Sequence, residues 1–396
     1  MPRRADPPPL CRAECFGPPS AATISHCRRF CAEPAGHDPV ELPGILLSEY
    51  YRERGRSRVG RLVDTANSLG AFCETIVVLG DAAVRRSAEA SACESAHPFY
   101  NLLSRGERGG RPRIVFIEPT LDVDVTQATL DLVRHTSDAL DPHDRWGLVI
   151  ATPEDAGSAS PAAESLVSAL RRSSSSDEDL RRRLYLLGDD AEVEAFFDVS
   201  NVPHTVLPRI ADGGAFDGAA VFASALVGAD VVAKLKGAVW FWEEARRDPT
   251  LRLAPLVELL GHEDLHVVAW HHALRYVARV LERPLIDGAG RDGRSSLAEL
   301  SSPRLHLFSA AVRHDRPEDA NSTPPSTSSD SGQFGTFVPT PVALRDALDD
   351  VRRAESAAGI TSAVIRLERL NDTALGELCG WLTAAKLVAA SLLNGE

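Results

Sequence analysis

Short runs of aliphatic and β-branched residues alternate with helical segments in the first half of the chain, and this alternation limits its fold more than any other feature. The runs lie at 76–79, 114–117, 148–150 and 184–187, and glycine, proline or charged residues bound each one. Between two of them, 125–133 has apolar residues at helical spacing. Strands that are apolar throughout are buried on both faces, so the pattern predicts a parallel sheet with helices on both sides.

The second half of the chain has the same mixture of helices and strands. We therefore expect two doubly wound α/β domains with parallel sheets, the first at residues 43–205 and the second at 206–396. The elements expected in the second domain are helices at 219–227, 231–244 and 251–260, a strand at 267–270, a helix at 271–281, a strand at 305–308, a helix at 341–357, a strand at 362–367 and a final helix from Asn371.

Two segments have compositions that do not form a core. Residues 1–42 are rich in proline, arginine and cysteine, and we expect them to be a disordered extension. Residues 317–335 are rich in Ser, Thr, Pro and Asp, which predicts a flexible loop. Two C-x-x-x-C pairs in the extension offer four thiolates to a zinc ion, the alternative being that the extension binds no metal. These cysteines are Cys11, Cys15, Cys27 and Cys31.

The charge of the chain excludes some classes of partner. It has 43 basic and 56 acidic side chains, a formal net charge of −13. This charge repels phosphate backbones and anionic lipids, so we expect neither nucleic acid nor membrane as a partner. No apolar stretch is long enough to span a bilayer, and prolines follow Arg3 and Arg4 where a signal peptide needs an apolar run. These features predict a cytoplasmic protein.

Three segments, in the correct order, resemble motifs of glucose-6-phosphate isomerases. Residues 365–378 read I-R-L-E-R-L-N-D-T-A-L-G-E-L and are similar to the family's strand, L-N-x-x-T-L-G-E-L motif and last helix. Residues 212–216, D-G-G-A-F, are similar to V-G-G-R-F/Y, and 285–294 align with A-E-S-x-G-K and the residues after it. The resemblance covers roughly residues 43–396. It implies two flavodoxin-like sugar-isomerase (SIS) domains, no cofactor, and a dimer as is common in the family.

The resemblance also locates the family's phosphate loops, and both are altered here. The first strand should end in G-x-G-G-S, but Gly80 is followed by Asp81 and no hydroxyl. The third strand should be followed by S-K-S-G-G-T, but Thr152 is followed closely by Glu154 and Asp155. Carboxylates in the first turn of a helix satisfy its dipole themselves. They also repel a dianionic phosphate, so the usual substrate is disfavoured.

The catalytic groups of the family are also incompletely represented. Gly213 and Gly214 match the two glycines of V-G-G-R-F/Y, but the arginine that stabilises the enediolate falls on Ala215. The glutamate that acts as base falls on Asp287, a carboxylate one methylene shorter. The ring-opening histidine has no clear match. The family's C-terminal lysine segment is not found before Glu396, where this sequence stops.

These features lead to three hypotheses for function. The first is a glucose-6-phosphate isomerase-like protein, of the family that interconverts glucose 6-phosphate and fructose 6-phosphate in glycolysis and gluconeogenesis, with impaired or no activity. The second is an active isomerase with a rebuilt site, in which Asp287 is the base for a different, neutral or cationic sugar. The third is a non-catalytic interaction scaffold. The expected partners are a sugar or sugar phosphate and a second copy or another protein.

One short motif suggests a metal but does not fit its context. Residues 262–266, H-E-D-L-H, match the H-E-x-x-H of zinc proteases, which lies on a helix so that both histidines face one metal. Here the strand expected at 267–270 follows immediately, and residues entering a strand do not share a face at that spacing. We therefore expect no metal at this motif.

Overall fold

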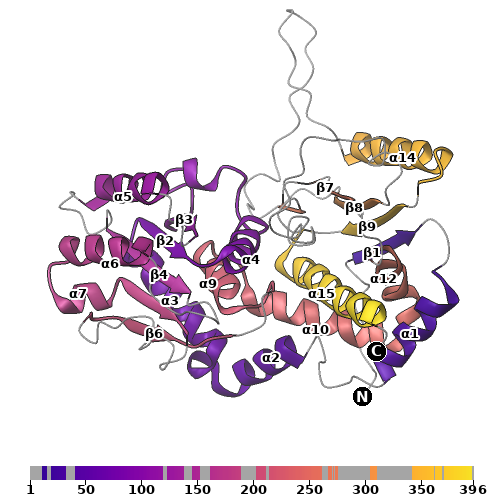
Figure 1. Ribbon diagram of the computed structural model, residues 1–396, viewed down its shortest axis with the longest axis horizontal. Coiled ribbons are helices and arrows are strands. Elements are labelled where there is room, and N and C mark those ends of the chain that lie inside the picture. The colour runs from indigo at the N-terminus through magenta and orange to yellow at the C-terminus, as the bar shows by residue number, and fades with distance from the viewer. Residues whose placement is uncertain are drawn as a thin grey trace, which may run out of the picture.

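The protein has a mixed α/β fold with two sheets, which lie in separate lobes (Figure 1). The computed structural model describes residues 11–15, 19–32, 41–118, 123–137, 145–151, 161–188, 202–210, 214–260, 266–269, 271, 273–274, 304–309, 341–360, 362–367 and 370–394.

The first sheet has five strands in the order β3-β2-β4-β5-β6, and every neighbouring pair is parallel. This confirms the four predicted strands and the parallel topology. The fifth strand, β6, is only three residues long and was not predicted. The bounds are β2 Thr75–Leu79, β3 Arg113–Ile117, β4 Trp146–Ala151, β5 Leu184–Leu187 and β6 Thr205–Leu207.

Both faces of the first sheet are covered, as a doubly wound fold requires. In β2, Ile76 and Val78 lie in one core cluster and Val77 and Leu79 in the other, because successive residues of a strand point to opposite faces. The first cluster is completed mainly by α3 (Arg58–Phe72), α4 (Ala82–Cys93) and α9 (Gly218–Leu226), and the second by α5 (Val123–Ser137) and α6 (Pro161–Ser173).

The helix expected around residues 125–133 is present as α5, but its buried face differs from the expected one. Val125 and Leu132 are 43% and 45% exposed, whereas Leu130 and Val133 are buried. The apolar pattern therefore predicted the helix correctly, but the residues of α5 that are buried against the sheet coincide with that pattern only in part.

The second sheet has the order β1-β9-β8-β7 and is not entirely parallel. β7, β8 and β9 are parallel, as expected, whereas β1 pairs antiparallel with β9. Figure 1 shows α14 on one side of this sheet and α12 and α15 on the other. The bounds are β1 Cys11–Cys15, β7 His266–Ala269, β8 Arg304–Ser309, β9 Ser362–Leu367, α12 Ala254–Leu260, α14 Pro341–Ala357 and α15 Asp372–Asn394.

The N-terminal segment was expected to be disordered, but it contributes β1 and the helix α1 (Ala21–Ala32) to the second lobe. Cys27 is fully buried in the core of that lobe. The hydroxyl of Ser20, just before α1, donates to Glu258 of α12 at 3.1 Å, and His26 Nε2 lies 2.9 Å from Ser391 Oγ of α15. Cys27 and these polar contacts hold α1 against α12 and α15.

Two helices link the lobes, α10 (Val231–Arg247) and α15 (Figure 1). Residues early in α10 lie in the first core, and later ones, such as Phe241, lie in the second. Residues from 206 onward were assigned to the second domain, yet β6 and α9 belong to the first lobe by their pairing and packing. Their apolar surface is buried against the first sheet and its helices.

The remaining helices are short or peripheral. The helix expected at 251–260 is broken at Leu253 into α11 and α12. The loop at 317–335 and most of the helix expected at 271–281 lie outside the described residues. None of the described helices has the length and hydropathy to cross a membrane. The other bounds are α2 Glu41–Glu53, η1 Arg54–Arg56, η2 Tyr100–Leu102, α7 Asp177–Arg181 and α11 Pro249–Arg252.

Candidate functional site

The candidate site is the edge of the first sheet where the parallel strands end, because ligands of open α/β sheets bind there. β2 ends at Leu79, and Gly80 leads directly into α4. A Cβ on Gly80 would lie 2.6 Å from Cγ1 of Val84, so any larger residue here would force Val84 to shift. Gly80, predicted as a binding residue, therefore has a packing role in this structure.

The N-terminus of α4 is capped by a carboxylate of the chain itself. Asp81 Oδ1 accepts hydrogen bonds from the backbone N–H groups of Ala83 and Val84, both at 2.8 Å. These are the free N–H groups through which a helix N-terminus binds phosphate. With Asp81 as N-cap, both groups are satisfied without a ligand.

A second carboxylate lies near the start of α4. Glu118, directly after β3, accepts a hydrogen bond from Arg85 Nη1 at 3.0 Å, and the two side chains are 40% and 39% exposed. The arginine in the first turn of α4 is therefore paired with an acid rather than open to an anion. A pair this exposed contributes little stability.

The helix α9 begins at the same edge and also has an aspartate as N-cap. Asp217 Oδ1 accepts a hydrogen bond from the backbone N–H of Ala220 at 2.6 Å, and Oδ2 contacts Ser87 Oγ of α4. The residue is only 6% exposed. Burial raises the pKa of the Asp217 carboxyl to about 6, and the charge of Asp81 acts in the same direction.

The loop before α9 contains the segment that resembles V-G-G-R-F/Y. Gly214 accepts the backbone hydrogen bond of Asp217 at 3.1 Å. Ala215, at the position of the family's arginine, packs against the first core, and its carbonyl accepts a hydrogen bond from Ser91 at 3.4 Å. This position therefore offers no cation to a developing negative charge.

Of the five predicted site residues, the structure places two at this edge. Gly80 and Gly214 lie in the segments that precede α4 and α9, whose N-caps are close enough for Asp81 to influence the titration of Asp217. Thr152, Gly213 and Asp287 lie outside the described residues. Asp217 was not predicted, although an aspartate directly before an apolar helical run is a recognisable N-cap signal.

Residues 365–378 form the segment that most resembles the family, and two residues of this segment have structural roles here. Asn371 Oδ1 caps α15 by accepting from the backbone N–H of Ala374 at 2.9 Å. Gly376 lies where α15 crosses α10, and a Cβ there would be 1.9 Å from the carbonyl oxygen of Lys234. This part of the motif positions the helix that joins the two lobes.

A buried ion pair lies at the same crossing and was missed from the sequence. Lys234 Nζ donates to Glu94 at 2.5 Å, to Ser224 Oγ at 3.0 Å and to the carbonyl of Ser91 at 3.2 Å. These bonds use all three donors of the ammonium group. Cys379 Sγ lies 3.9 Å from Glu94, and burial raises the pKa of this thiol. The cluster ties α4, α9, α10 and α15 together rather than facing a ligand.

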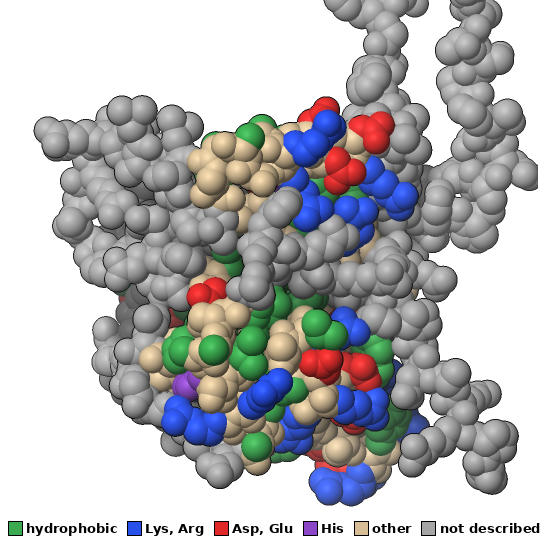
Figure 2. Space-filling view, turned by 90° about the vertical axis from the view of Figure 1, so that its right-hand side faces the viewer, with side chains coloured by type: hydrophobic (Ala, Val, Ile, Leu, Met, Phe, Trp, Pro, Cys, Tyr) green, Lys and Arg blue, Asp and Glu red, His purple; other side chains and the backbone are tan. Residues whose placement is uncertain are grey.

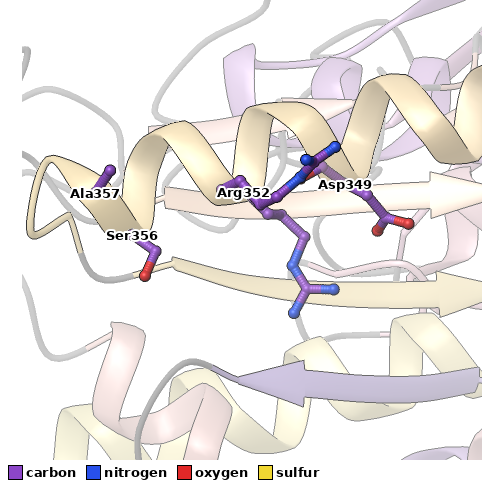
Figure 3. A pocket seen from close by; sticks show the side chains of 5 residues that line it. Asp349, Arg352, Ser356 and Ala357 are labelled. Carbon is purple, nitrogen blue, oxygen red and sulfur yellow. The ribbon is translucent and has the colours of Figure 1, made fainter.

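Two hollows on the described surface lie away from Asp81 and Asp217. One of about 210 Å³ lies beside α4 and β3, with Phe99 and Leu102 exposed at its rim. The other, about 520 Å³, lies along α14, and Figure 3 shows Asp349 and Ser356 on that helix. Basic and acidic side chains are interspersed on the face seen in Figure 2. Within the described ranges, no group of His, Cys, Asp and Glu is arranged to hold a metal ion.

Comparison with known proteins identifies the fold. No family model matches the chain, and no curated protein matches its sequence. Its structure superposes on that of a hypothetical protein from Thermus thermophilus with a TM-score of 0.61 and 14% identity, covering 93% of this chain and 89% of the other. A glucose-6-phosphate isomerase from Chlamydia trachomatis gives 0.56 and 13%, covering 92% and 73%.

The chain has the fold of a glucose-6-phosphate isomerase. This confirms the fold expected from the sequence resemblance. An identity this low supports a likeness of fold alone, so the activity has to be argued from the site.

Proposed function

We propose that this protein is a glucose-6-phosphate isomerase-like protein that no longer holds a sugar phosphate at its first sheet and has lost most or all isomerase activity. The observation that supports this most strongly is the N-terminus of α4, where Asp81 occupies the N–H groups that would bind a phosphate.

Electrostatics at this edge oppose the family's substrate. Each unit of charge on a phosphate about 4 Å from a carboxylate would cost about 4 kcal/mol at an effective dielectric constant of about 20. Asp81 caps the beginning of α4, and Arg85 in the first turn of that helix is already neutralised by its pair with Glu118. A dianionic phosphate would therefore meet repulsion where the fold usually provides attraction.

The chemistry would also lack a stabilising donor. Isomerisation through an enediolate depends on donors directed at the developing negative charge, and removing one such donor typically lowers turnover by about 10²–10³-fold. Ala215 has no side-chain donor and packs against the core. Both arguments favour impaired activity over a fully active enzyme.

A coupled isomerase assay tests the proposal, with fructose 6-phosphate as substrate and glucose 6-phosphate as the detected product. The Asp287→Asn variant serves as control because Asp287 is the position of the family's base. We expect the wild type and the variant to give the same background rate at high protein concentration. Turnover in the wild type that the variant lacks would refute the proposal and support an active site rebuilt around Asp287.

The carboxylate-rich edge favours one alternative, an active isomerase for a neutral or cationic sugar. Replacing the phosphate ester in the assay by an unphosphorylated or amino sugar tests it, with the same Asp287→Asn control. A homodimer, a protein partner and a cytoplasmic location remain proposals from the sequence. If neither sugar class binds or turns over, the interaction scaffold becomes the leading hypothesis.

A further inference from the structure

Where α4 contacts α9 at the candidate site, the hydroxyl of Ser87 faces two acceptors but has one hydrogen to donate. Ser87 Oγ lies 2.9 Å from the carbonyl oxygen of Val84 and also within hydrogen-bond distance of Asp217 Oδ2. A serine hydroxyl has a single hydrogen to donate. Ser87 is 4% exposed and Asp217 is 6% exposed, so the mismatch lies in the interior.

Both contacts of Ser87 can be hydrogen bonds at the same time in only one arrangement of the hydrogens. A carbonyl oxygen only accepts, so the contact between Ser87 and Val84 needs the hydrogen of Ser87. The contact between Ser87 and Asp217 then needs a hydrogen on Asp217 Oδ2. The other oxygen, Oδ1, accepts the backbone N–H of Ala220 at 2.6 Å, which suits the carbonyl oxygen of a carboxylic acid. A protonated Asp217 therefore accommodates both contacts of Ser87 together with the N–H of Ala220.

The surroundings of Asp217 also favour the neutral acid. Burial raises the pKa of its carboxyl to about 6, and the negative charge of Asp81 adds to this. The hydrogen bond with Ser87 and the backbone N–H groups at the start of α9 act in the opposite direction. The charged side chains closest in sequence are Arg85, which pairs with Glu118, and the exposed Arg86 on α4, together with the half-buried Arg209 in the segment before α9.

We propose that the Asp217 carboxyl is a proton-binding site that locks α4 to α9. In the protonated state it donates to Ser87, and Ser87 donates to Val84. When Asp217 releases its proton to solvent, Ser87 has to turn its hydrogen to the carboxylate, which leaves the Val84 carbonyl without it. A buried negative charge then lies close enough to Asp81, the N-cap of α4, to be repelled by it. The junction is therefore tighter at mildly acidic pH than at neutral pH, whichever ligand the site accepts.

The sign of the pH dependence follows from linkage. The pKa of Asp217 rises from its ordinary value of 3.8 in the unfolded chain to about 6 in the folded protein. Between these values the folded protein binds more protons than the unfolded chain. The contribution of Asp217 to folding is therefore greatest below pH 3.8. This contribution is lost as the pH rises to about 6, and above that pH the effect of Asp217 on stability no longer changes.

The test compares denaturant midpoints between about pH 4 and pH 8 for the wild type and two variants, each as the full chain. In Asp217→Asn the amide donates to Ser87 and accepts from Ala220, as the protonated acid does, but it cannot ionise. Asp230→Asn is the matched control, because Asp230 is the exposed N-cap of α10 and accepts from Ala233 at 2.9 Å. A buried carboxylic acid also has its own carbonyl band in the infrared spectrum.

We expect the midpoint of the wild type to fall relative to that of Asp217→Asn as the pH rises to about 6, while Asp230→Asn follows the wild type. The carbonyl band of the acid should be present in the wild type near pH 5 and absent from Asp217→Asn. Parallel midpoints for the wild type and Asp217→Asn would overturn the proposal. So would an Asp217→Asn chain that does not fold, or a wild type without that band.

Discussion

At the residue scale, the candidate site contains two aspartates whose carboxylates accept backbone hydrogen bonds that a bound anion could otherwise accept. Asp81 and Asp217 each cap a helix that begins at the ligand-binding edge of the first sheet. An N-cap aspartate stabilises its helix by satisfying N–H groups and complementing the helix dipole. An aspartate at such a position therefore adds local stability and, in our proposal, takes the place of a phosphate, and both effects arise from the same hydrogen bonds.

The stabilising effect of Asp81 can be measured alone. Asp81→Ala removes the acceptor for the N–H groups of Ala83 and Val84 and should lower the free energy of unfolding by about 1 kcal/mol. Chemical denaturation at constant pH measures the change. Asp81→Asn keeps the cap and should stay close to the wild type. Equal stability of the wild type and Asp81→Ala would show that Asp81 does not cap α4.

At the element scale, the sequence predicted the strands that depend on local composition and missed those that depend on partners. β2, β3 and β5 contain apolar runs and were predicted to within one residue. β1 reads C-R-A-E-C, has no such run, and is a strand only because it pairs with β9. An apolar run reports burial directly, whereas pairing with a distant strand leaves no local pattern.

The same distinction applies to the candidate site. The resemblance to the family predicted that Asp81 stands in a phosphate loop and that Ala215 stands at the position of an arginine. It did not show that Asp217 meets Ser87 across 130 positions, or that Lys234 meets Glu94 across 140. Such pairs depend on how α4, α9 and α10 pack, and a single sequence contains no signal for that packing.

The crossing of α10 and α15 should be intolerant of any side chain at Gly376. Gly376→Ala places a methyl group against the backbone of α10, so the helices must separate, and we expect a loss of about 3 kcal/mol in the free energy of unfolding.

Gly44→Ala provides the control for this substitution, because Gly44 lies in α2 with no atom within 4 Å of the added Cβ. It should be neutral or stabilising by up to about 1 kcal/mol, since alanine has the higher helix propensity. Denaturant unfolding of both variants measures the difference. A Gly376→Ala variant as stable as Gly44→Ala would contradict the close approach of the two helices.

At the scale of the whole molecule, the chain has the fold of a glucose-6-phosphate isomerase, and aspartates cap the helices at the ligand-binding edge of its first sheet. The parts that build the core tolerate little change, as Gly376 and the buried pair of Lys234 and Glu94 illustrate. At two helix N-termini of the first lobe, Asp81 and Asp217 serve as caps.

The most direct test of this account is calorimetric titration of the full chain with fructose 6-phosphate, with unphosphorylated fructose as the control ligand. We predict no saturable binding of fructose 6-phosphate at millimolar concentrations, because Asp81 already occupies the N–H groups at the start of α4. Saturable binding that inorganic phosphate displaces and that fructose does not reproduce would contradict the account, since it would require a working phosphate site in this protein.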